Sequence, residues 1–342
     1  MKKAIKTENK QRSDMTSPNF LKNDLLSETE ELSKSYEFNK VYSLDELSQG
    51  FANKNYKLTT DSGIFLFRIC MQQSEADMHY EMQLLTELKK YNFPAAYPVK
   101  RNDGNFISNI SSGKVILYEF VNGQNPEQNS NTVREIAKAV SLLNSIPNWH
   151  EFPKKNAVHI DECVKLITEF PKAANQFPDF FEYFTEQTDF LFNPLKEQFP
   201  KGIVHGDAFP DNTVFDGDRL VAVIDFEEAC IDNLLFDIGI TINGFCFENN
   251  RLNFELVRVF LETYHRKRPI TQKESEYLPF FIQWGAHGMI YWHLRNNLLF
   301  NYNEDQVKRI DELIGRVKQL RNSEKEMSVT FLSFMRSSKL AL

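Results

Sequence analysis

The sequence predicts an α+β protein of two lobes, with a small antiparallel sheet in the N-terminal lobe and mainly helices in the C-terminal lobe. Residues 56–121 contain several short runs of β-branched and aromatic residues separated by turn residues, which is the pattern of a small sheet. After this region, apolar residues recur mostly at helical spacing. The chain has 342 residues, more than a single compact unit usually needs. We therefore expect an extension over residues 1–35, an N-terminal lobe over 36–121 and a C-terminal lobe over 122–342.

The N-terminal lobe is expected to follow a polar segment. Residues 1–35 are rich in Lys, Asn, Ser, Thr and Glu and lack a sustained apolar period, which predicts a disordered or loosely attached extension. Turn residues Asp61-Ser62-Gly63 separate the first two strands and predict a hairpin. The predicted elements are, in order, strands over 56–60 and 64–69, a helix over 75–91, and strands near 106–107 and over 115–121.

The C-terminal lobe is expected to be helical apart from one short hairpin. Residues 132–146 place apolar side chains on one broad helical face. Residues 148–200 are interrupted by Phe and Pro and predict two further helices. Residues 213–215 and 220–224 predict the hairpin, because Asp216-Gly217-Asp218 between them is a turn sequence. Helices are expected again from about residue 236 to the end.

Composition and charge narrow the class of protein. The formal net charge of -7 argues against a nucleic-acid partner, whose usual mark is a basic surface. The polar N-terminus has no apolar signal core, and the apolar stretch 277–300 is interrupted by polar and charged residues. The 4 cysteines have no CxxC spacing, which predicts reduced thiols rather than a zinc site or disulfides. We therefore expect a cytoplasmic protein with neither nucleic acid nor membrane as a partner.

One segment carries the residues of a phosphoryl-transfer site. It reads His205-Gly206-Asp207-Ala208-Phe209-Pro210-Asp211-Asn212 and is followed, after the predicted hairpin, by Ile224-Asp225-Phe226. Because a hairpin returns its two ends to one edge, Asp207, Asn212 and Asp225 are expected to converge. Phosphoryl transfer needs a carboxylate near the attacking hydroxyl and oxygen ligands for Mg²⁺. We therefore assign Asp207 as the catalytic residue and Asn212 and Asp225 as metal ligands.

Each part of this motif also has a simpler explanation, because Asp and Asn are common turn residues. The ordered combination is more specific than its parts, and it predicts an ATP- and Mg²⁺-dependent kinase that phosphorylates a small-molecule hydroxyl. The sequence Gly-x-x-x-x-Gly-Lys-[Ser/Thr] does not occur in the chain, which excludes a P-loop enzyme.

The motif His-Gly-Asp-x-x-x-x-Asn with the later Ile-Asp-Phe resembles the aminoglycoside phosphotransferase and choline kinase superfamily, which has a protein-kinase-like fold. Within it the chain looks most like the bacterial homoserine kinases of that fold, over about residues 40–320 and most strongly over 202–275. The resemblance implies ATP and Mg²⁺ as cofactors and L-homoserine as the acceptor. Choline, ethanolamine and aminoglycoside kinases stay open as alternatives, and a nucleotide-binding pseudokinase or scaffold is an alternative of another class.

The resemblance also implies which residues bind the nucleotide. Arg68 stands where the family places a cation on the third strand, and Glu81 is its expected partner on the following helix; an edge charge and a solvated helix face are the alternatives. Asp237 is a candidate N-cap that the family uses to steady the catalytic loop. The glycine-containing first turn is expected to cover the phosphates, and the main chain at the end of the last predicted strand of this lobe is expected to bind adenine. The expected cofactor-binding residues are therefore Arg68, Glu81, Gly50, Asn53, Glu119 and Val121.

The acceptor is expected to carry an amine, because nine acidic residues and one Arg lie between His205 and Ile240. A solvated acidic loop would explain the same charge. An amino acid would also need a cation for its carboxylate, which Arg295, His293, His287 or Arg251 can supply. Aromatic residues on one predicted helix can form a box for a quaternary ammonium or simply belong to the core; these are Trp284, Tyr291 and Trp292. The candidate substrate-binding residues are Glu227, Asp232, Asn243 and Arg295.

Overall fold

The computed structural model describes residues 18–47, 53–147, 149–169, 178–298 and 302–339. The chain divides into two compact units, and each is described by itself. Unit 1 contains the residues up to Thr86 together with Ala96–Val121. Unit 2 contains Glu87–Ala95 and all residues from Asn122 onward.

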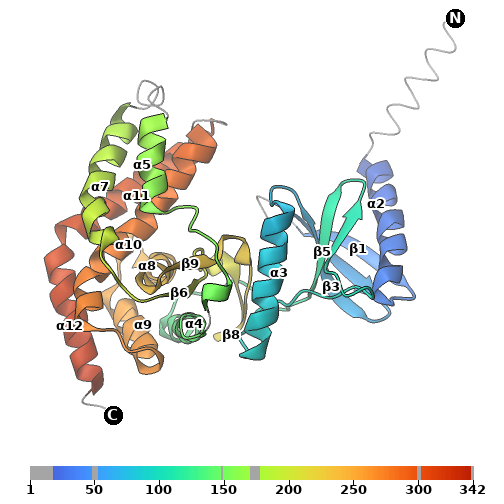
Figure 1. The fold of residues 1–342 in the computed structure, drawn as a ribbon, viewed down its shortest axis with the longest axis horizontal. Helices are drawn as coiled ribbons and strands as arrows, with labels where there is room; N and C mark the ends of the chain where they lie inside the picture. Colours follow the sequence, from blue (N-terminus) through green and yellow to red (C-terminus); the bar gives the residue numbers. More distant parts are fainter. Residues whose placement is uncertain (1–17, 48–52, 148, 170–177, 299–301, 340–342) are drawn as a thin grey trace, which may run out of the picture. The chain divides into compact units, whose positions relative to one another are not determined.

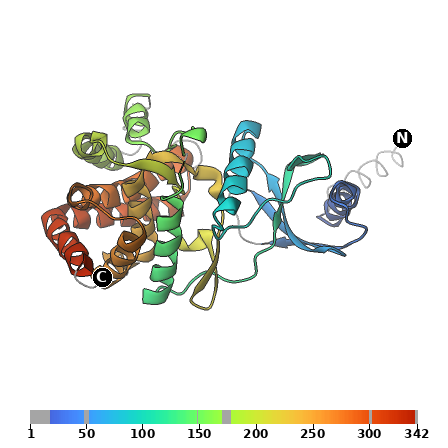
Figure 2. The same ribbon diagram turned by 60° about the horizontal axis from the view of Figure 1, so that its bottom comes forward.

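Unit 1 is built on a five-stranded antiparallel sheet in the order β1-β2-β3-β5-β4. Helix α3, Glu75–Lys90, belongs to this unit up to Thr86, and this part and helix α2, Pro18–Ser33, lie on opposite sides of the sheet (Figures 1 and 2). The predicted strands and the predicted helix of this lobe are confirmed, and the structure adds one strand that was not predicted, β1. The strands are β1 Val41–Leu47, β2 Lys54–Thr60, β3 Gly63–Cys70, β4 Ile107–Ile110 and β5 Gly113–Glu119.

Alternation along the strands gives the sheet two different faces. Phe67 and Ile69 of β3, with Val115 and Leu117 of β5, belong to one apolar cluster. The residues between them, such as Arg68, therefore point to the other face, because successive side chains of a strand alternate. The apolar cluster is also completed by residues of the segment before β1, namely Leu25, Leu26, Leu32, Tyr36 and Phe38.

The expectation of a disordered or loosely attached extension is wrong for residues 18–35. They form α2 and the start of a 3₁₀ turn, Lys34–Tyr36. The Glu28 carboxylate accepts hydrogen bonds from the backbone N–H (2.8 Å) and the hydroxyl (3.0 Å) of Ser111. The leucines of α2 that pack on the apolar cluster, Leu25, Leu26 and Leu32, stand within a mostly polar segment, which hid the helix. Residues 1–17 lie outside the described residues.

Unit 2 is mainly helical, as predicted, with two short antiparallel strand pairs next to the His-Gly-Asp segment, residues 205–212. The predicted hairpin is β7, Thr213–Asp216, with β8, Arg219–Val223. A second pair joins β6, Lys201–Val204, to β9, Cys230–Asn233. A short pair, β10 Phe247–Glu248 and β11 Arg251–Leu252, follows later. The helices are α4 Ser130–Leu143, α5 Ile160–Glu169, α7 Pro178–Lys196, α8 Leu234–Phe245, α9 Phe254–Lys267, α10 Gln272–His293, α11 Glu304–Asn322 and α12 Glu324–Lys339.

Helix α8 lies in the middle of unit 2, with α4, α9, α10 and the β6–β9 pair around it (Figure 1). It packs against α10 at two glycines. A Cβ on Gly239 would lie 2.3 Å from the Phe281 carbonyl oxygen, and one on Gly285 would lie 3.2 Å from the Gly239 carbonyl. Only glycine at these positions lets the two backbones approach this closely, so α10 fixes the position of α8. Among the described residues, no helix is long and apolar enough to cross a membrane.

We expect Gly239→Ala to lower the free energy of unfolding by about 3 kcal/mol or more, since the added methyl overlaps a backbone carbonyl that cannot move alone. Gly315→Ala is the matched control, because it is also a helical glycine, yet its Cβ would lie 3.8 Å from its nearest neighbour, Asn250 Nδ2. That control should be neutral or stabilising by up to about 1 kcal/mol. Chemical denaturation measures both values, and equal effects at the two sites would contradict the close packing of α8 on α10.

Candidate active site

The HGD loop, residues 205–212, connects β6 to the β7–β8 hairpin. It turns tightly at Gly206, whose φ is 78°. A Cβ at this position would lie 3.0 Å from the carbonyl oxygen of Glu228, so glycine is required both by the backbone angle and by the space. The loop ends in one 3₁₀ turn, Pro210–Asn212, which leads directly into β7.

The carboxylate of Asp237 holds the start of this loop. Its Oδ1 accepts the backbone N–H groups of His205 (3.0 Å) and Gly206 (3.1 Å), and its Oδ2 accepts from Asn144 Nδ2 (3.0 Å). The expectation that Asp237 is a helix N-cap is wrong, because α8 begins at Leu234 and Asn233 is its N-cap. Asp237 instead lies within the first turns and uses its side chain on the neighbouring loop. Burial raises the pKa of Asp237, and these donors together with His205 offset that effect.

His205 joins the HGD loop to the end of β8. Its Nδ1 accepts the backbone N–H of Asp207 (3.2 Å), so the other ring nitrogen carries the hydrogen and donates to the Ile224 carbonyl (3.1 Å). Burial lowers the pKa of His205, which keeps the ring neutral and this tautomer in place. Its ring also packs edge-on against Phe226, with 4.6 Å between the centroids. The imidazole therefore connects the residues beside Asp207 with the residues beside Asp225.

Asn212 is oriented by Asp207. Its Nδ2 donates to the Asp207 carboxylate oxygen Oδ2 (2.6 Å) and to the Asp207 carbonyl (2.9 Å). Because both acceptors face the amide nitrogen, the Asn212 Oδ1 oxygen points away from Asp207. An amide oxygen is a hard ligand of the kind that Mg²⁺ binds.

Asp225 follows β8 in an unusual backbone conformation. Its φ of 67° and ψ of 68° lie in the left-handed region, which is uncommon for a residue with a side chain. The buried ring of Phe226 anchors the next position by packing edge-on against Phe93 at 5.9 Å. Such strained residues cluster at functional sites. The carboxylate of Asp225 is close enough to Asp207 to raise its pKa, so the structure brings Asp207, Asn212 and Asp225 together.

The pKa of Asp207 is raised well above its ordinary value. Burial is the largest cause, followed by the negative charges of Asp225, Asp211 and Glu228, while the hydrogen bond from Asn212 works in the opposite direction. Like charges held together in this way are stabilised by a cation. The arrangement can therefore bind a divalent ion and, once the charge is balanced, can accept a proton at Asp207.

In unit 1, Arg68 and Glu81 both contact Tyr118. The Tyr118 hydroxyl donates to Glu81 Oε1 (3.0 Å), and the Arg68 guanidinium lies over the Tyr118 ring, 5.4 Å from its centroid. Arg68 Nε donates to Asn55 Oδ1 (3.2 Å), and Gln73 donates to Glu81 Oε2 (2.9 Å). All three central side chains are buried. The predicted pair, Arg68 and Glu81, therefore meets Tyr118 at one face of the sheet. Sequence reasoning missed Tyr118, because only its alternation with Leu117 along β5 indicates that its side chain points to this face.

The other predicted nucleotide residues lie at strand ends of unit 1. Asn53 precedes β2, and its side-chain oxygen accepts the backbone N–H of Met71 (3.1 Å). Glu119 is the last residue of β5 and its N–H donates to the Tyr97 carbonyl (2.8 Å). Val121 is half-buried at the end of the unit. Gly50 lies outside the described residues.

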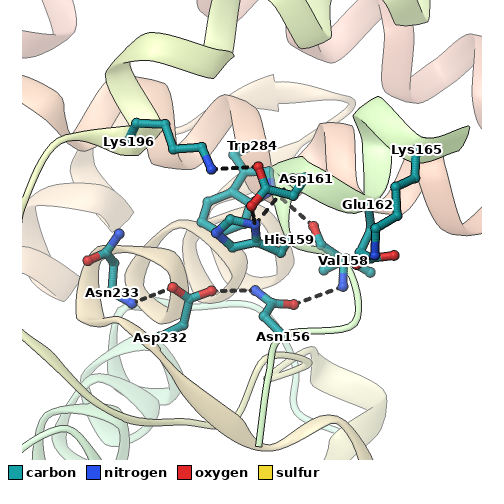
Figure 3. A network of polar contacts seen from close by, with 10 residues as sticks. All are labelled: Asn156, Val158, His159, Asp161, Glu162, Lys165, Lys196, Asp232, Asn233 and Trp284. Carbon is teal, nitrogen blue, oxygen red and sulfur yellow. Dashed lines mark hydrogen bonds and ion pairs between the residues drawn. The ribbon is translucent and has the colours of Figure 1, made fainter. Parts of the chain in front are cut away.

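Two predicted substrate residues are instead held in the protein core. Asp232 is buried and accepts hydrogen bonds from Asn156 Nδ2 and the Asn233 backbone N–H, both 2.7 Å, as Figure 3 shows. The Asn243 amide nitrogen donates to the Gly239 (2.8 Å) and Ile282 (2.7 Å) carbonyls. Asn243 therefore joins α8 to α10, and neither side chain is presented to a substrate.

The remaining substrate candidates are more accessible. Glu227 is half-buried in the turn after Asp225, and its carbonyl accepts a hydrogen bond from Lys154 Nζ. Arg295 is exposed just after α10. An aromatic box on α10 is excluded for Trp284, which is buried, packs against Phe236 at 4.2 Å and donates to a backbone carbonyl. Both histidines offered as alternatives to Arg295 are buried, namely His287 and His293.

Sequence reasoning missed two residues that contact the Asp237 network. Asn144, at the C-terminal end of α4, donates to Asp237, and Tyr264 of α9 donates to Asn144 Oδ1 (2.8 Å). They lie 93 and 120 residues from their partners along the chain, so no local spacing points to them. The only local signal is that Asn144 follows an apolar helical face at the position where a helix ends.

Comparison with known proteins places these features in a family. Residues 43–270 match the phosphotransferase enzyme family. Among curated proteins, a homoserine kinase of Bradyrhizobium sp. is 26% identical over 74% of this chain and 79% of its own length. A homoserine kinase of Methylobacillus flagellatus is 28% identical over 78% of this chain and 83% of its own length.

Solved structures share the fold at low sequence identity. A microcompartment-associated aminopropanol kinase superposes with a TM-score of 0.69 at 14% identity, covering 89% of this chain and 98% of its own. An amicoumacin kinase in complex with AMP-PNP and Ca²⁺ gives a TM-score of 0.66 at 15% identity, covering 85% and 93%. The expected two-lobed, protein-kinase-like α+β fold is therefore confirmed.

We expect Asp207→Asn to raise the melting temperature at neutral pH, by about 2 °C or more. Folding raises the pKa of Asp207, so its ionisation costs stability, and this cost grows as pH rises from the ordinary Asp pKa toward the raised one. Below about pH 4 both residues are uncharged and the two proteins should melt together. Thermal unfolding in Mg²⁺-free buffer measures the difference across this range.

Asp218→Asn is the control for that measurement. Hydrogen bonds from Asn131 and Asn129 lower the pKa of Asp218, so its ionised form contributes stability that is lost as pH falls. The same change of charge should therefore leave the melting temperature at neutral pH unchanged or lower. A higher value for both variants, or a lower value for Asp207→Asn, would contradict the strained charge at Asp207.

Proposed function

This chain belongs to the phosphotransferase enzyme family, and we propose that it transfers the γ-phosphoryl group of ATP to the hydroxyl of L-homoserine, giving O-phospho-L-homoserine and ADP. It is a kinase of a small-molecule hydroxyl. The observation that carries the proposal is the cluster of Asp207, Asn212 and Asp225, held on the HGD loop and at the end of β8. The finer assignment, homoserine, is supported by the names of the curated relatives that match 74% and 78% of the chain.

We assign Asp207 to the acceptor hydroxyl. In the transfer, a bond forms between the hydroxyl oxygen and the γ-phosphorus, the bond to the β-phosphate oxygen breaks, and the hydroxyl proton passes to Asp207. Asp207 must be ionised to take this proton, and the neighbouring negative charges that raise its pKa in the metal-free protein are the ones that a bound divalent ion would offset. Asn212 holds the carboxylate at Oδ2, so that its orientation is set before the acceptor binds.

We assign Mg²⁺ to Asn212 and Asp225. The donor set fits, since the Asn212 amide oxygen and the Asp225 carboxylate are hard ligands beside a surplus of negative charge. Within the described residues, no group of three or more His, Cys, Asp or Glu is arranged to hold a metal by itself. Two protein ligands are enough where nucleotide phosphates and water complete the coordination. When bound, the ion neutralises charge that develops on the phosphates.

In unit 1, we assign the nucleotide phosphates to Arg68, with Glu81 and Tyr118 fixing its side chain. A guanidinium presents several N–H donors in one plane and binds phosphate well. Gly50 and Asn53 are proposed to cover the phosphates, and the main chain at Glu119 and Val121 is proposed to bind adenine. Divalent-metal and nucleotide use agrees with the neighbour solved with AMP-PNP and Ca²⁺.

The acceptor is proposed to carry an ammonium group and a carboxylate. Glu227 and the acidic residues beside Asp207 are proposed to attract the ammonium, and Arg295 is the candidate for the carboxylate, with Arg251, which is also exposed, as the alternative. Asp232 and Asn243 are left out of this subsite, since their polar groups are bonded within the core. Action in the cytoplasm without a nucleic-acid partner stays a prediction of composition and charge.

We expect purified protein with ATP and Mg²⁺ to phosphorylate L-homoserine in preference to ethanolamine, choline, an aminopropanol and an aminoglycoside. Phosphorus NMR identifies the product. Asp207→Asn should lower kcat by about 100-fold or more, the usual contribution of a positioned base, while nucleotide binding measured by calorimetry is retained. Turnover of another panel member would correct the acceptor, whereas ATP binding without transfer to any member would support a pseudokinase.

We expect Tyr118→Phe to raise the KM for ATP about tenfold, because Glu81 loses a buried donor and no longer fixes the residues around Arg68. The KM for the acceptor should change less than about twofold. Tyr36→Phe is the matched control, as it also removes a buried hydroxyl in unit 1, one that bonds to Ser108 (3.2 Å). An unchanged KM for ATP in Tyr118→Phe, or an equal rise in the control, would rule out this role.

A further inference from the structure

We propose that Asn144 and Tyr264 are positioning residues for catalysis, which act on the HGD loop through Asp237. This inference rests on the proposed phosphoryl transfer but not on the identity of the acceptor. Asn144, Tyr264 and Asp237 come from the end of α4, from α9 and from α8. They form one chain of hydrogen bonds that ends on the backbone N–H groups of the two residues before Asp207.

Asn144 has only one orientation that satisfies its neighbours. Its Nδ2 donates to two acceptors, the Ile203 carbonyl and Asp237 Oδ2, each at 3.0 Å. Its Oδ1 accepts the Tyr264 hydroxyl at 2.8 Å. A flipped amide would place its oxygen against two acceptors and its N–H groups toward a hydroxyl, so the amide is fixed from both ends.

Tyr264 supplies the hydroxyl from a rigid position. The residue is fully buried on α9, and its ring stacks on Phe260 with 6.1 Å between centroids. Burial raises the pKa of Tyr264, so the hydroxyl stays protonated and donates. Because burial also excludes water from Asn144, no solvent molecule replaces this donor readily when it is removed.

The consequence for catalysis follows from the shared acceptor. Asp237 carries a buried carboxylate whose Oδ2 is bonded to Asn144 and whose Oδ1 is bonded to the N–H groups of His205 and Gly206. A change at Oδ2 alters the position and the charge distribution of the whole carboxylate, and so alters the first two residues of the HGD loop. Asp207 follows directly, and its N–H is bonded to His205. A displacement of less than an ångström at a reacting group is enough to slow transfer.

We expect Tyr264→Phe to lower kcat about fivefold, with the KM for ATP and for the acceptor changed less than twofold. A lower kcat with unchanged KM values distinguishes positioning from general destabilisation. Destabilisation would lower the amount of active enzyme but would leave kcat per folded enzyme unchanged. Tyr36→Phe again provides the control, since it removes a bonded, buried hydroxyl of unit 1 and should leave kcat unchanged. Active-site titration normalises every rate to folded enzyme.

A double-mutant cycle tests whether Tyr264 acts through Asn144. Asn144→Ala should lower kcat by about 50-fold, and adding Tyr264→Phe should then have no further effect on kcat. If Asn144→Ala does not give folded protein, Asn144→Ser, which keeps a polar group, takes its place. Independent, multiplying losses in the double variant, or an unchanged kcat in Tyr264→Phe alone, would overturn the inference.

The test does not depend on the identity of the acceptor. Rates are measured with whichever hydroxyl the wild type phosphorylates, and also as the slow hydrolysis of ATP by water. No turnover of homoserine by the wild type would contradict the proposed acceptor and leave the cycle measurable. A normal wild-type rate with an unaffected Tyr264→Phe variant would contradict the positioning role alone.

Discussion

The buried carboxylate of Asp237 accepts the backbone N–H groups of His205 and Gly206 and so ties the HGD loop to helix α8. Asp237 itself is held in a fixed position, because α8 packs closely against α10 at Gly239. A carboxylate without water is costly unless donors surround it, and here backbone and amide groups provide them. The positions of Asp207 and Asn212 follow from this attachment, since the loop is short and is held by the turn at Gly206 and the 3₁₀ turn Pro210–Asn212.

Repulsion between the carboxylates of the site lowers the stability of the fold that holds them together. Asp207 lies among three other carboxylates that raise its pKa, and at neutral pH its ionisation costs the folded protein stability. Natural sites accept such costs where function requires them. A metal ion between the nucleotide and this cluster would remove much of the repulsion, so the same charges that weaken the metal-free protein favour binding of its cofactor.

The fold and the meeting of the three candidate site residues could be predicted largely from sequence, because both depend on local pattern. Asp207, Asn212 and Asp225 lie beside a hairpin whose turn is evident, and the hairpin forces them together. Helix α2 was not predicted, since the leucines that it packs on the sheet, Leu25, Leu26 and Leu32, are few and stand within a mostly polar segment. Asn243 was open to misinterpretation for a similar reason: its partner carbonyl, Ile282, belongs to a distant helix, and only the helix packing reveals that its amide is already bonded.

Hydrogen exchange of the His205 and Gly206 amides tests most directly whether Asp237 positions the HGD loop. In Asp237→Ala both carboxylate oxygens are removed, so the His205 and Gly206 amides lose their acceptor. The account predicts strong protection of the two amides in the wild type and rapid exchange in the variant, with the β7–β8 hairpin amides still protected. Equal protection of both amides in the two proteins would contradict it.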